Sequence, residues 1–338
     1  MTDIQQRKLD HLALLQQDPQ IERGDSGLAD IRLLHRALPE LDFDEVDTRT
    51  TFLDIEVRFP FLISSMTGGA GDTLQHINQH LAEAAEAMQV PMAVGSQRIM
   101  LERPDARSSF QLRRFAPSVP LIANLGAIQL NNGIALTEIE EVIDTLDADA
   151  LYLHLNPLQE VIQPEGNRNF AELSDRIAEV VDSIDIPVIL KEVGCGLSPL
   201  DIELGLRVGV RHFDLAARGG TSWSRIEAHR SQDDLGLTFQ DWGLTLKEAL
   251  KLAAPYRNQA TLIASGGIRT GVDMVKCVIM GSSMCGVAAP LLAAAMESTS
   301  AVIQVIERFW KEYRTAQFLL GAPSFEHLFD NRQLLLST

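Results

Sequence analysis

Four polar side chains lie close together in the segment His154-Leu155-Asn156-Pro157-Leu158-Gln159-Glu160. On an extended strand, His154 and Asn156 face the same side, and Pro157 then ends the strand, so that Gln159 and Glu160 come from the loop. A glutamate in such a cluster can bind Mg2+, a hard cation that takes one or two carboxylates and completes its shell with substrate phosphates. Taken alone, His154 would be a hydrogen-bonded core residue and Glu160 a surface residue. The convergence of four polar groups favours a functional site.

Small hydrogen-bonding residues end three earlier apolar runs. They are Ser65-Met66-Thr67-Gly68-Gly69, Gly95-Ser96-Gln97-Arg98 and Asn124-Leu125-Gly126. Such residues let a planar ligand approach the backbone. Any one of these segments could simply end a strand. Their occurrence after successive strands favours a binding site.

Two later segments have the composition of a phosphate site. Ser265-Gly266-Gly267-Ile268-Arg269 and Gly286-Val287-Ala288-Ala289-Pro290 each follow an apolar run and precede a helical stretch. Glycine backbones and helix N-termini supply N–H donors to phosphate in the last loops of (β/α)8 barrels. A glycine pair alone could be only a tight turn. Together with Arg269, these segments favour a phosphate-bearing cofactor.

Lys191 lies in the apolar run VILKEV. A buried ammonium is costly without a partner or an anionic ligand, so we expect it to contact a cofactor. Beside a flavin, such a lysine would stabilise negative charge at the N1/O2 side of the reduced ring. On an edge strand it could instead reach solvent or pair with Glu192. If the strands close into a barrel, as their number predicts, there is no edge strand and the contact with a cofactor is favoured.

The elements that must position these residues are short apolar runs alternating with amphipathic helical stretches, a pattern typical of a parallel α/β fold. The runs are Phe61 to Met66, Met92 to Gly95, Leu121 to Leu125, Leu151 to Leu155, Val188 to Val193, His212 to Ala216, Thr261 to Ala264 and Met284 to Ala288. Eight nearly continuous apolar strands predict a (β/α)8 TIM barrel. A doubly wound sheet is the alternative, but no G-x-G-x-x-G motif follows an early strand.

The remaining segments fit around one barrel domain spanning residues 1–338. We expect Asp72 to cap a helix, and Thr137 with Glu140 to form a capping box. Residues 1–55 are expected to form an N-terminal helix and a short antiparallel cap that closes over the substrate, and residues 56–338 the barrel. The stretch from Ser298 to Leu320 predicts a long C-terminal closing helix.

Composition narrows the range of partners. A formal net charge of -17 argues against a nucleic-acid partner, because phosphate backbones are bound by lysine and arginine. The three cysteines, Cys195, Cys277 and Cys285, are scattered, so neither a disulfide framework nor a zinc site is indicated. The polar start lacks a signal-peptide h-region, and the longest apolar stretch is too short to span a bilayer. We expect a soluble, cytoplasmic protein without a membrane partner.

These motifs together resemble those of type 2 isopentenyl diphosphate isomerases. Arg7-Lys8 with His11, SSMTGG, GSQR, HLNPLQE, LKEVG, ARGGTSW and SGGIRTG occur in the order seen in that family, over nearly the whole chain. HLNPLQE combined with SMTGG and the N-terminal Arg-Lys pair is specific, whereas Ala288-Ala289 fits the pattern without being distinctive. The resemblance implies FMN and Mg2+ as cofactors, NAD(P)H as reductant, and a homo-oligomer, either a tetramer or an octamer. It also implies interconversion of isopentenyl and dimethylallyl diphosphate in isoprenoid biosynthesis, with the flavin reduced but not consumed.

The resemblance also assigns roles to residues. FMN would be surrounded by Ser65, Met66, Thr67, Ser96, Asn124, Lys191, Thr221, Gly267, Arg269, Ala288 and Ala289. The substrate would face Arg7, Lys8, Ser96, Gln97, Arg98 and Gln159, and the metal Glu160. Local cations and Mg2+ would thus neutralise a diphosphate on an acidic protein.

Allylic isomerisation adds a proton at one carbon and removes one from another, so it needs a positioned acid/base. The resemblance assigns that role to N5 of the reduced flavin, with Gln159 orienting or relaying the proton and His154 and Asn156 supporting the site. Glu227 is the next carboxylate to consider, although a position in the long loop after the sixth strand favours a solvated residue. The alternative functions are an FMN-dependent oxidoreductase acting on a hydroxy acid or carbonyl, and a non-catalytic barrel that binds a ligand.

Overall fold

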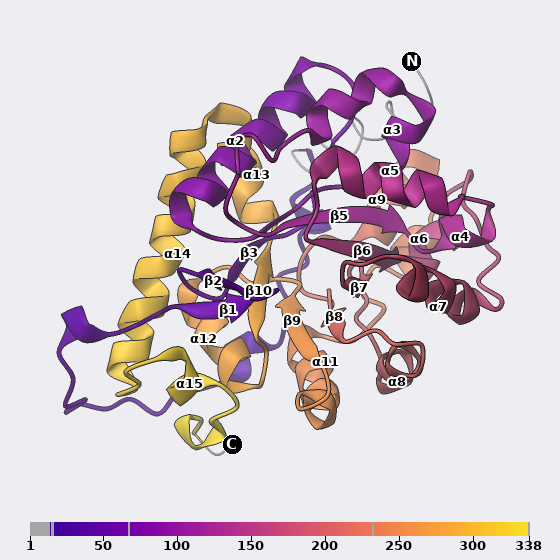
Figure 1. The fold of residues 1–338 in the computed structure, drawn as a ribbon. Coiled ribbons are helices and arrows are strands. Elements are labelled where there is room, and N and C mark those ends of the chain that lie inside the picture. The colour runs from indigo at the N-terminus through magenta and orange to yellow at the C-terminus, as the bar shows by residue number, and fades with distance from the viewer. Residues whose placement is uncertain (1–13, 15–16, 67, 232, 337–338) are drawn as a thin grey trace.

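The computed structural model describes residues 14, 17–66, 68–231 and 233–336, which contain a closed barrel of eight parallel strands. Around the barrel the order is β10, β3, β4, β5, β6, β7, β8 and β9, so each strand lies beside the next one along the chain (Figure 1). This confirms the predicted (β/α)8 fold, and each of the eight apolar runs contains a barrel strand. The strands are β3 (Phe61–Ile63), β4 (Met92–Ala93), β5 (Leu121–Gly126), β6 (Ala150–Leu155), β7 (Val188–Glu192), β8 (His212–Asp214), β9 (Thr261–Ser265) and β10 (Met284–Val287).

Several strands end earlier than their apolar runs. The ladder stops at Ile63 in β3 and at Asp214 in β8, two or three residues before the predicted ends. The residues that follow leave the ladder and enter the loops above the barrel. Gly68 and Gly194, with φ of 155° and 135°, illustrate the turns that these loops make. The mouth of the barrel is therefore built from loop backbone as well as from strand ends.

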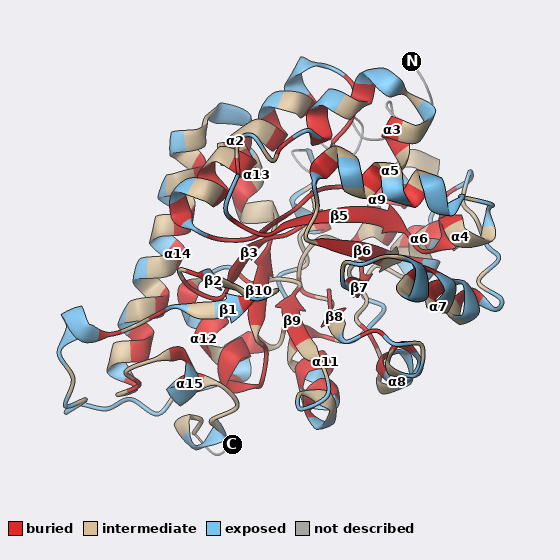
Figure 2. Cartoon of the chain, viewed as in Figure 1, coloured by how far each residue is buried: buried red, intermediate tan, exposed pale blue. Residues whose placement is uncertain are grey.

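Helices cover the outside of the barrel and bury one face each, as Figure 2 shows by the inward position of their buried residues. In α2, for example, Leu74, Ile77 and Leu81 are buried at spacings of three and four, while Asp72 and His76 are exposed. The main helices are α2 (Asp72–Met88), α3 (Arg98–Glu102), α4 (Ile128–Asn131), α5 (Leu136–Leu146), α6 (Pro157–Ile162), α7 (Leu173–Ser183), α8 (Pro199–Arg207), α9 (Trp223–Ser231), α10 (Leu235–Thr238), α11 (Leu246–Ala253), α12 (Gly271–Ile279), α13 (Ala289–Glu297), α14 (Thr299–Leu319) and α15 (Phe325–Leu328).

Both predicted helix caps are wrong. The N-cap of α2 is Gly71, and Asp72 is the first helical residue. Helix α5 starts after Ala135, whose backbone N–H donates to the Glu138 carboxylate at 2.8 Å, so Thr137 lies inside the helix. In both helices the N-cap position is taken by a residue without a polar side chain, Gly71 or Ala135, because the backbone leaves the helix there.

A hairpin packs against the barrel interior. Strands β1 (Thr50–Phe52) and β2 (Ile55–Val57) pair antiparallel, and Phe52 and Val57 join a buried cluster with Leu62, Ile122 and Tyr152 from inside the barrel. A short antiparallel pair is present as expected, but it extends to Val57, beyond residue 55, and packs against the barrel interior. The closing of residues 1–55 over the substrate stays a prediction. The predicted N-terminal helix falls largely on residues outside the described part of the chain.

The closing helix is also confirmed. Helix α14 begins after Ser298, whose hydroxyl accepts the Ala301 N–H at 3.1 Å, and it packs along α2, α12 and α13 (Figure 1). Within the described residues, no helix combines the length and apolar character needed to cross a bilayer.

Candidate active site

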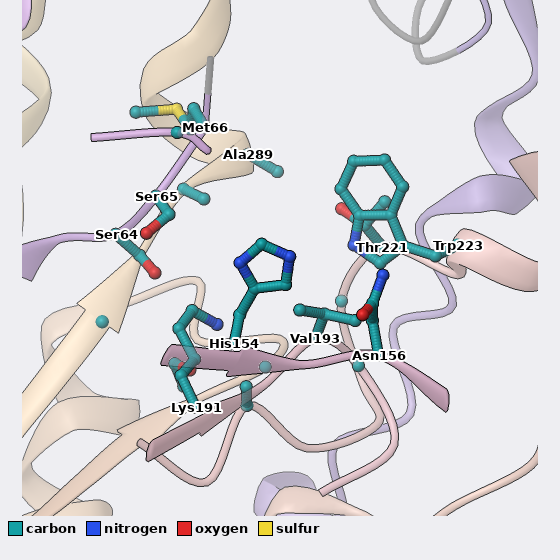
Figure 3. Close-up of a pocket in the computed structure, with 18 of the residues that line it drawn as sticks. Ser64, Ser65, Met66, His154, Asn156, Lys191, Val193, Thr221, Trp223 and Ala289 are labelled. Carbon is teal, nitrogen blue, oxygen red and sulfur yellow. The ribbon is translucent and has the colours of Figure 1, made fainter. Parts of the chain in front are cut away.

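A cavity of about 270 Å3 lies at the carboxyl ends of the strands, and residues following every barrel strand line it. Active sites of these barrels occupy that end. Figure 3 shows His154 and Lys191 rising from neighbouring strands, with Ser65 and Met66 on one side and Asn156, Thr221 and Trp223 on the other. The expected site residues that line the cavity are Ser65, Met66, Ser96, Arg98, Asn124, His154, Asn156, Gln159, Glu160, Lys191, Thr221, Gly267, Arg269, Ala288 and Ala289.

Four expected residues remain, of which the structure describes only Gln97. Arg7, Lys8 and Thr67 lie outside the described residues. Gln97 is fully buried behind the wall, where its Nε2 donates to the Val142 carbonyl at 2.9 Å and its Oε1 accepts the Asn124 N–H at 3.0 Å. Gln97 therefore supports the wall that carries Asn124.

The segment after β6 forms one hydrogen-bonded cluster. Pro157 starts α6, which places Gln159 and Glu160 three and four residues after Asn156, on one face of the helix. Asn156 Nδ2 donates to Gln159 Oε1 at 3.1 Å and to Glu160 Oε1 at 3.0 Å. Glu160 Oε2 accepts from Gln163 Nε2 at 2.8 Å and from the Asn167 N–H at 2.6 Å. The buried Glu160 carboxylate is thereby fixed at the cavity wall.

Glu227 extends this cluster, contrary to the expectation of a solvated loop residue. It lies in helix α9 and is fully buried, because the helix turns that face towards α6. Its Oε1 accepts from Gln159 Nε2 at 2.9 Å, and its Oε2 pairs with Arg230, which also bonds Glu165 at 2.8 Å. The Gln159 amide is thus held from both ends.

The donor set suits Mg2+. Asn156 Oδ1 is buried without a hydrogen-bond partner, and it comes from the same side chain that contacts Glu160. Within the described part of the chain, no three His, Cys, Asp or Glu residues cluster as a metal cage. Mg2+ commonly takes one or two carboxylates and fills its shell with water and substrate phosphate. Glu160 supplies one carboxylate for that pattern, and Asn156 Oδ1, on the side of the amide away from Glu160, is an oxygen without a hydrogen-bond partner.

A second hydrogen-bonded row connects Ser65, Asn124 and His154. Asn124 Nδ2 donates to Ser65 Oγ at 2.9 Å and to the Val94 carbonyl at 3.0 Å, which leaves Asn124 Oδ1 as the acceptor facing His154 Nδ1 at 2.7 Å. His154 Nδ1 must therefore carry a proton, and in the neutral ring Nε2 has the lone pair.

Lys191 lies in the cavity floor and is buried. Its Nζ donates to the Glu192 carbonyl at 2.9 Å and lies 3.9 Å from Asp214 Oδ2. The Glu192 carboxylate points elsewhere and accepts the backbone N–H groups of the turn from Val193 to Gly196. Burial raises the pKa of Glu192 to about 7, although these N–H donors oppose the shift. Sequence reasoning did not single out Asp214, even though a charged residue within the run HFDLAA was a signal of the same kind as Lys191.

The opposite end of the cavity has the features of a phosphate site. Helix α13 begins at Ala289 after Ala288, without a side-chain cap, whereas Thr270 caps α12 by accepting the Asp273 N–H at 3.1 Å. The uncapped start of α13 lines the cavity and offers the Ala289 N–H to an anion, whereas Pro290 has no N–H and the Leu291 N–H donates to the Ala288 carbonyl at 2.9 Å. Gly267 has φ of 82°, and a Cβ there would lie 2.3 Å from the Gly219 carbonyl oxygen, so only glycine permits this close packing of the two loops.

Sequence reasoning also missed Glu22, which lines the cavity beside this end. Its carboxylate pairs with Arg269 and accepts the Thr221 hydroxyl. The backbone of Glu22 pairs antiparallel with that of Thr221, which brings a segment from the N-terminal region to the mouth. No sequence spacing connects these residues, since the barrel alone brings them together.

By its family match, the chain belongs to the FMN-dependent (β/α)8 barrels. A family model described as FMN-dependent dehydrogenase matches residues 154–335. Among solved structures, a mandelate oxidase mutant with an FMN adduct is 18% identical and covers 92% of this chain and 88% of that chain, with a TM-score of 0.66. A flavocytochrome b2 mutant with pyruvate bound is 18% identical and covers 94% and 78%, with a TM-score of 0.69. At this identity the two structures share the fold.

Closer relatives specify the family. The isopentenyl-diphosphate delta-isomerase of Hydrogenovibrio crunogenus is 60% identical over 337 residues, which are 98% of each chain. The protein of the same name from Paracoccus zeaxanthinifaciens is 58% identical and covers 97% of this chain and 96% of that one. A third, from Nostoc sp., is 41% identical over 96% and 94%. The chain belongs to the isopentenyl-diphosphate delta-isomerases, an enzyme family, and the resemblance found in the sequence to its FMN-dependent type 2 is confirmed.

Proposed function

We propose that this protein interconverts isopentenyl and dimethylallyl diphosphate, with FMN in the barrel mouth and Mg2+ beside Glu160. The observation that carries the proposal is the cluster after β6, where Asn156, Gln159, Glu160 and the buried Glu227 form one hydrogen-bonded group at the cavity wall. The relatives that carry the isomerase name support the same reaction.

FMN, when bound and reduced, would supply the acid/base chemistry that an allylic isomerisation needs. We propose that its phosphate lies at the uncapped start of α13, near Gly267 and Arg269, and that Lys191 contacts the ring. Ser65, Met66, Thr67, Ser96, Asn124 and Thr221 would complete the cofactor site. Lys191 would supply a positive charge to the ring, and the row from Ser65 to His154 fixes the polar groups of the neighbouring wall.

The chain itself would bind and orient the substrate. Arg98, which pairs with Glu102 at 2.9 Å, lies at the mouth and can exchange that exposed partner for a diphosphate. Arg7 and Lys8 are proposed to add two further cations, and Mg2+ held by Glu160 would neutralise the remaining charge. Substrate diphosphate would thus be recognised by local charges despite the net charge of -17.

We propose that Gln159 positions the reacting carbon chain and that Glu227 fixes Gln159. Gln159 Oε1 accepts from Asn156 and its Nε2 donates to Glu227, so the amide has one defined orientation. An amide is a poor acid or base, which makes positioning its natural role. Glu227 is the nearest carboxylate to which a proton could be passed through Gln159.

The test is an anaerobic assay of isopentenyl diphosphate with FMN, Mg2+ and NADPH that follows product and nicotinamide together. We expect many turnovers of allylic product for each NADPH consumed, because isomerisation leaves the flavin reduced. The alternative FMN-dependent oxidoreductase would consume nicotinamide, or a hydroxy acid, in proportion to product. Proportional consumption, or no isomerisation by a flavin-loaded protein, would reject the proposal.

Three finer properties belong to the same proposal. NAD(P)H is proposed as the reductant, a tetramer or octamer as the assembly, and the cytoplasm as the location. Light scattering of the FMN-loaded protein measures the assembly, and comparison of NADH with NADPH in the anaerobic assay identifies the reductant.

A further inference from the structure

Asp214 is a fully buried carboxylate at the end of β8, next to the cavity floor. Its Oδ2 accepts the Tyr152 hydroxyl at 2.8 Å, and its Oδ1 accepts the Ser265 hydroxyl and the Ala216 N–H, the latter at 3.2 Å. An ionised carboxylate inside a protein requires a cation or several donors. Here both are present, because the Lys191 ammonium lies 3.9 Å from Oδ2.

The barrel register creates this arrangement. His154 pairs with Lys191 across β6 and β7, and Lys191 pairs with Asp214 across β7 and β8, so three polar side chains lie at one level of neighbouring strands. His154 and Lys191 line the cavity, whereas Asp214 lies behind Lys191. Burial raises the pKa of Tyr152 well above its usual value, so its hydroxyl stays a neutral donor. The group therefore places one basic side chain, Lys191, beside one acidic side chain, Asp214, with a separation of 3.9 Å.

We propose that Asp214 is a positioning residue that opposes the charge of Lys191 and thereby limits how strongly the cavity floor favours the reduced, anionic form of FMN. This inference rests on the proposed binding of FMN in the cavity. Two-electron reduction of the isoalloxazine ring with uptake of one proton leaves one negative charge on the ring. The Lys191 ammonium stabilises that charge, and the Asp214 carboxylate beside it acts with the opposite sign.

Asp214→Asn separates charge from shape. The asparagine Oδ1 can still accept from Ser265 and Ala216, and its Nδ2 can donate to the Tyr152 oxygen, because a hydroxyl both donates and accepts. The negative charge is lost while contacts to Ser265, Ala216 and Tyr152 are kept, the bond to Tyr152 with its direction reversed. Coulomb's law with an effective dielectric constant of about 20 predicts roughly a tenfold effect from removing a unit charge within about 10 Å of the ring.

The experiment measures the two-electron reduction potential of bound FMN at pH 7, using xanthine and xanthine oxidase as the reducing system and a reference dye. We expect Asp214→Asn to increase the affinity for reduced relative to oxidised FMN about tenfold, a rise in potential of about 30 mV. The matched control is Tyr152→Phe, which removes one donor to Asp214 and keeps the carboxylate. A carboxylate with fewer donors carries a more localised negative charge, so this control is expected to lower the potential.

The measured potentials of the variants decide whether Asp214 has this role. An unchanged or lower potential in Asp214→Asn overturns the proposal, and so does the same upward shift in both variants, because a disturbed network would then explain both. If Asp214→Asn fails to fold, the decision rests on Tyr152→Phe together with Ser265→Ala, and failure of both to lower the potential overturns the proposal. A parent protein that does not bind FMN would reject the proposed function itself, whereas bound FMN with an insensitive potential rejects only the role of Asp214.

Discussion

Replacing Glu160 by Gln tests the metal site most directly. The substitution nearly preserves size and removes the negative charge that favours a hard cation. Mutation of residues that only support metal ligands typically costs about 10- to 100-fold in affinity or activity, so loss of the carboxylate ligand itself should raise the Mg2+ requirement by more than about 100-fold. FMN should be retained, because its proposed phosphate site is at α13, after β10.

The hydrogen bonds of Glu160 set a second expected effect. Both carboxylate oxygens accept, one from Asn156 and the other from Gln163 and Asn167. A glutamine keeps one acceptor oxygen and turns an NH2 group towards a donor, which costs about 1–3 kcal/mol where a buried polar group stays unsatisfied. Some loss of stability is therefore expected without any change at the metal.

The assay is a Mg2+ titration of anaerobic isomerisation, with FMN content measured by absorbance and stability by urea unfolding. Gln163→Met is the matched control, because it removes a donor to Glu160 and leaves the carboxylate charge. We expect its Mg2+ requirement to stay below that of Glu160→Gln at similar stability. A parental Mg2+ curve in Glu160→Gln refutes the ligand assignment, and equal shifts in both variants would attribute the effect to the hydrogen bonds. Loss of FMN as well would show that the metal and flavin sites are not separate.

Three further outcomes are expected. Gly266→Ala should lower the free energy of unfolding, measured by urea unfolding, by more than about 2 kcal/mol and impair FMN binding. At φ of 112° the added Cβ would lie 1.9 Å from the Ala217 carbonyl oxygen. The control Gly133→Ala, at φ of 86° with no atom within 4 Å of the added Cβ, should cost only about 1 kcal/mol. The pKa of Glu192 is raised to about 7 in the folded state, so folding favours its protonated form and the free energy of unfolding should fall as pH rises from about 4.5 to about 7. Glu192→Gln should flatten this dependence of stability on pH. An unchanged pH dependence in urea unfolding would contradict the assignment. Arg225 lowers the pKa of Asp18 to about 2, so their contact should stabilise the fold above about pH 4 and weaken as pH falls towards 2. Asp18→Asn should lower the free energy of unfolding by about 1 kcal/mol or less at neutral pH and leave it unchanged in acid. An equal loss of stability at neutral and acid pH would exclude the ion pair as its cause.

The local pattern of the sequence predicted the barrel because it records which residues avoid water. Runs such as VILKEV are apolar at nearly every position, and a strand covered on both sides needs that composition. The helix starts were predicted less accurately. Gly71 and Ala135 are the N-caps of α2 and α5, whereas the sequence pattern favoured the polar residues Asp72 and Thr137. Capping depends on backbone angles that periodicity does not encode.

In the candidate site, too, some contacts could be predicted from the sequence and others could not. Asn156, Gln159 and Glu160 are close in sequence, so one helical turn after β6 suffices to bring them together. The sequence predicted this cluster, although it placed Gln159 and Glu160 in a loop rather than in helix α6. His154 was expected to join it and instead bonds Asn124. The partners across the barrel were decided by the tertiary structure. Gln159 meets Glu227 from a distant helix, Lys191 meets Asp214 through strand register, and Arg269 meets Glu22 across 247 positions of the chain. A hydrophobic pattern specifies which face of an element is buried, but barrel closure and register determine which polar groups then share the interior.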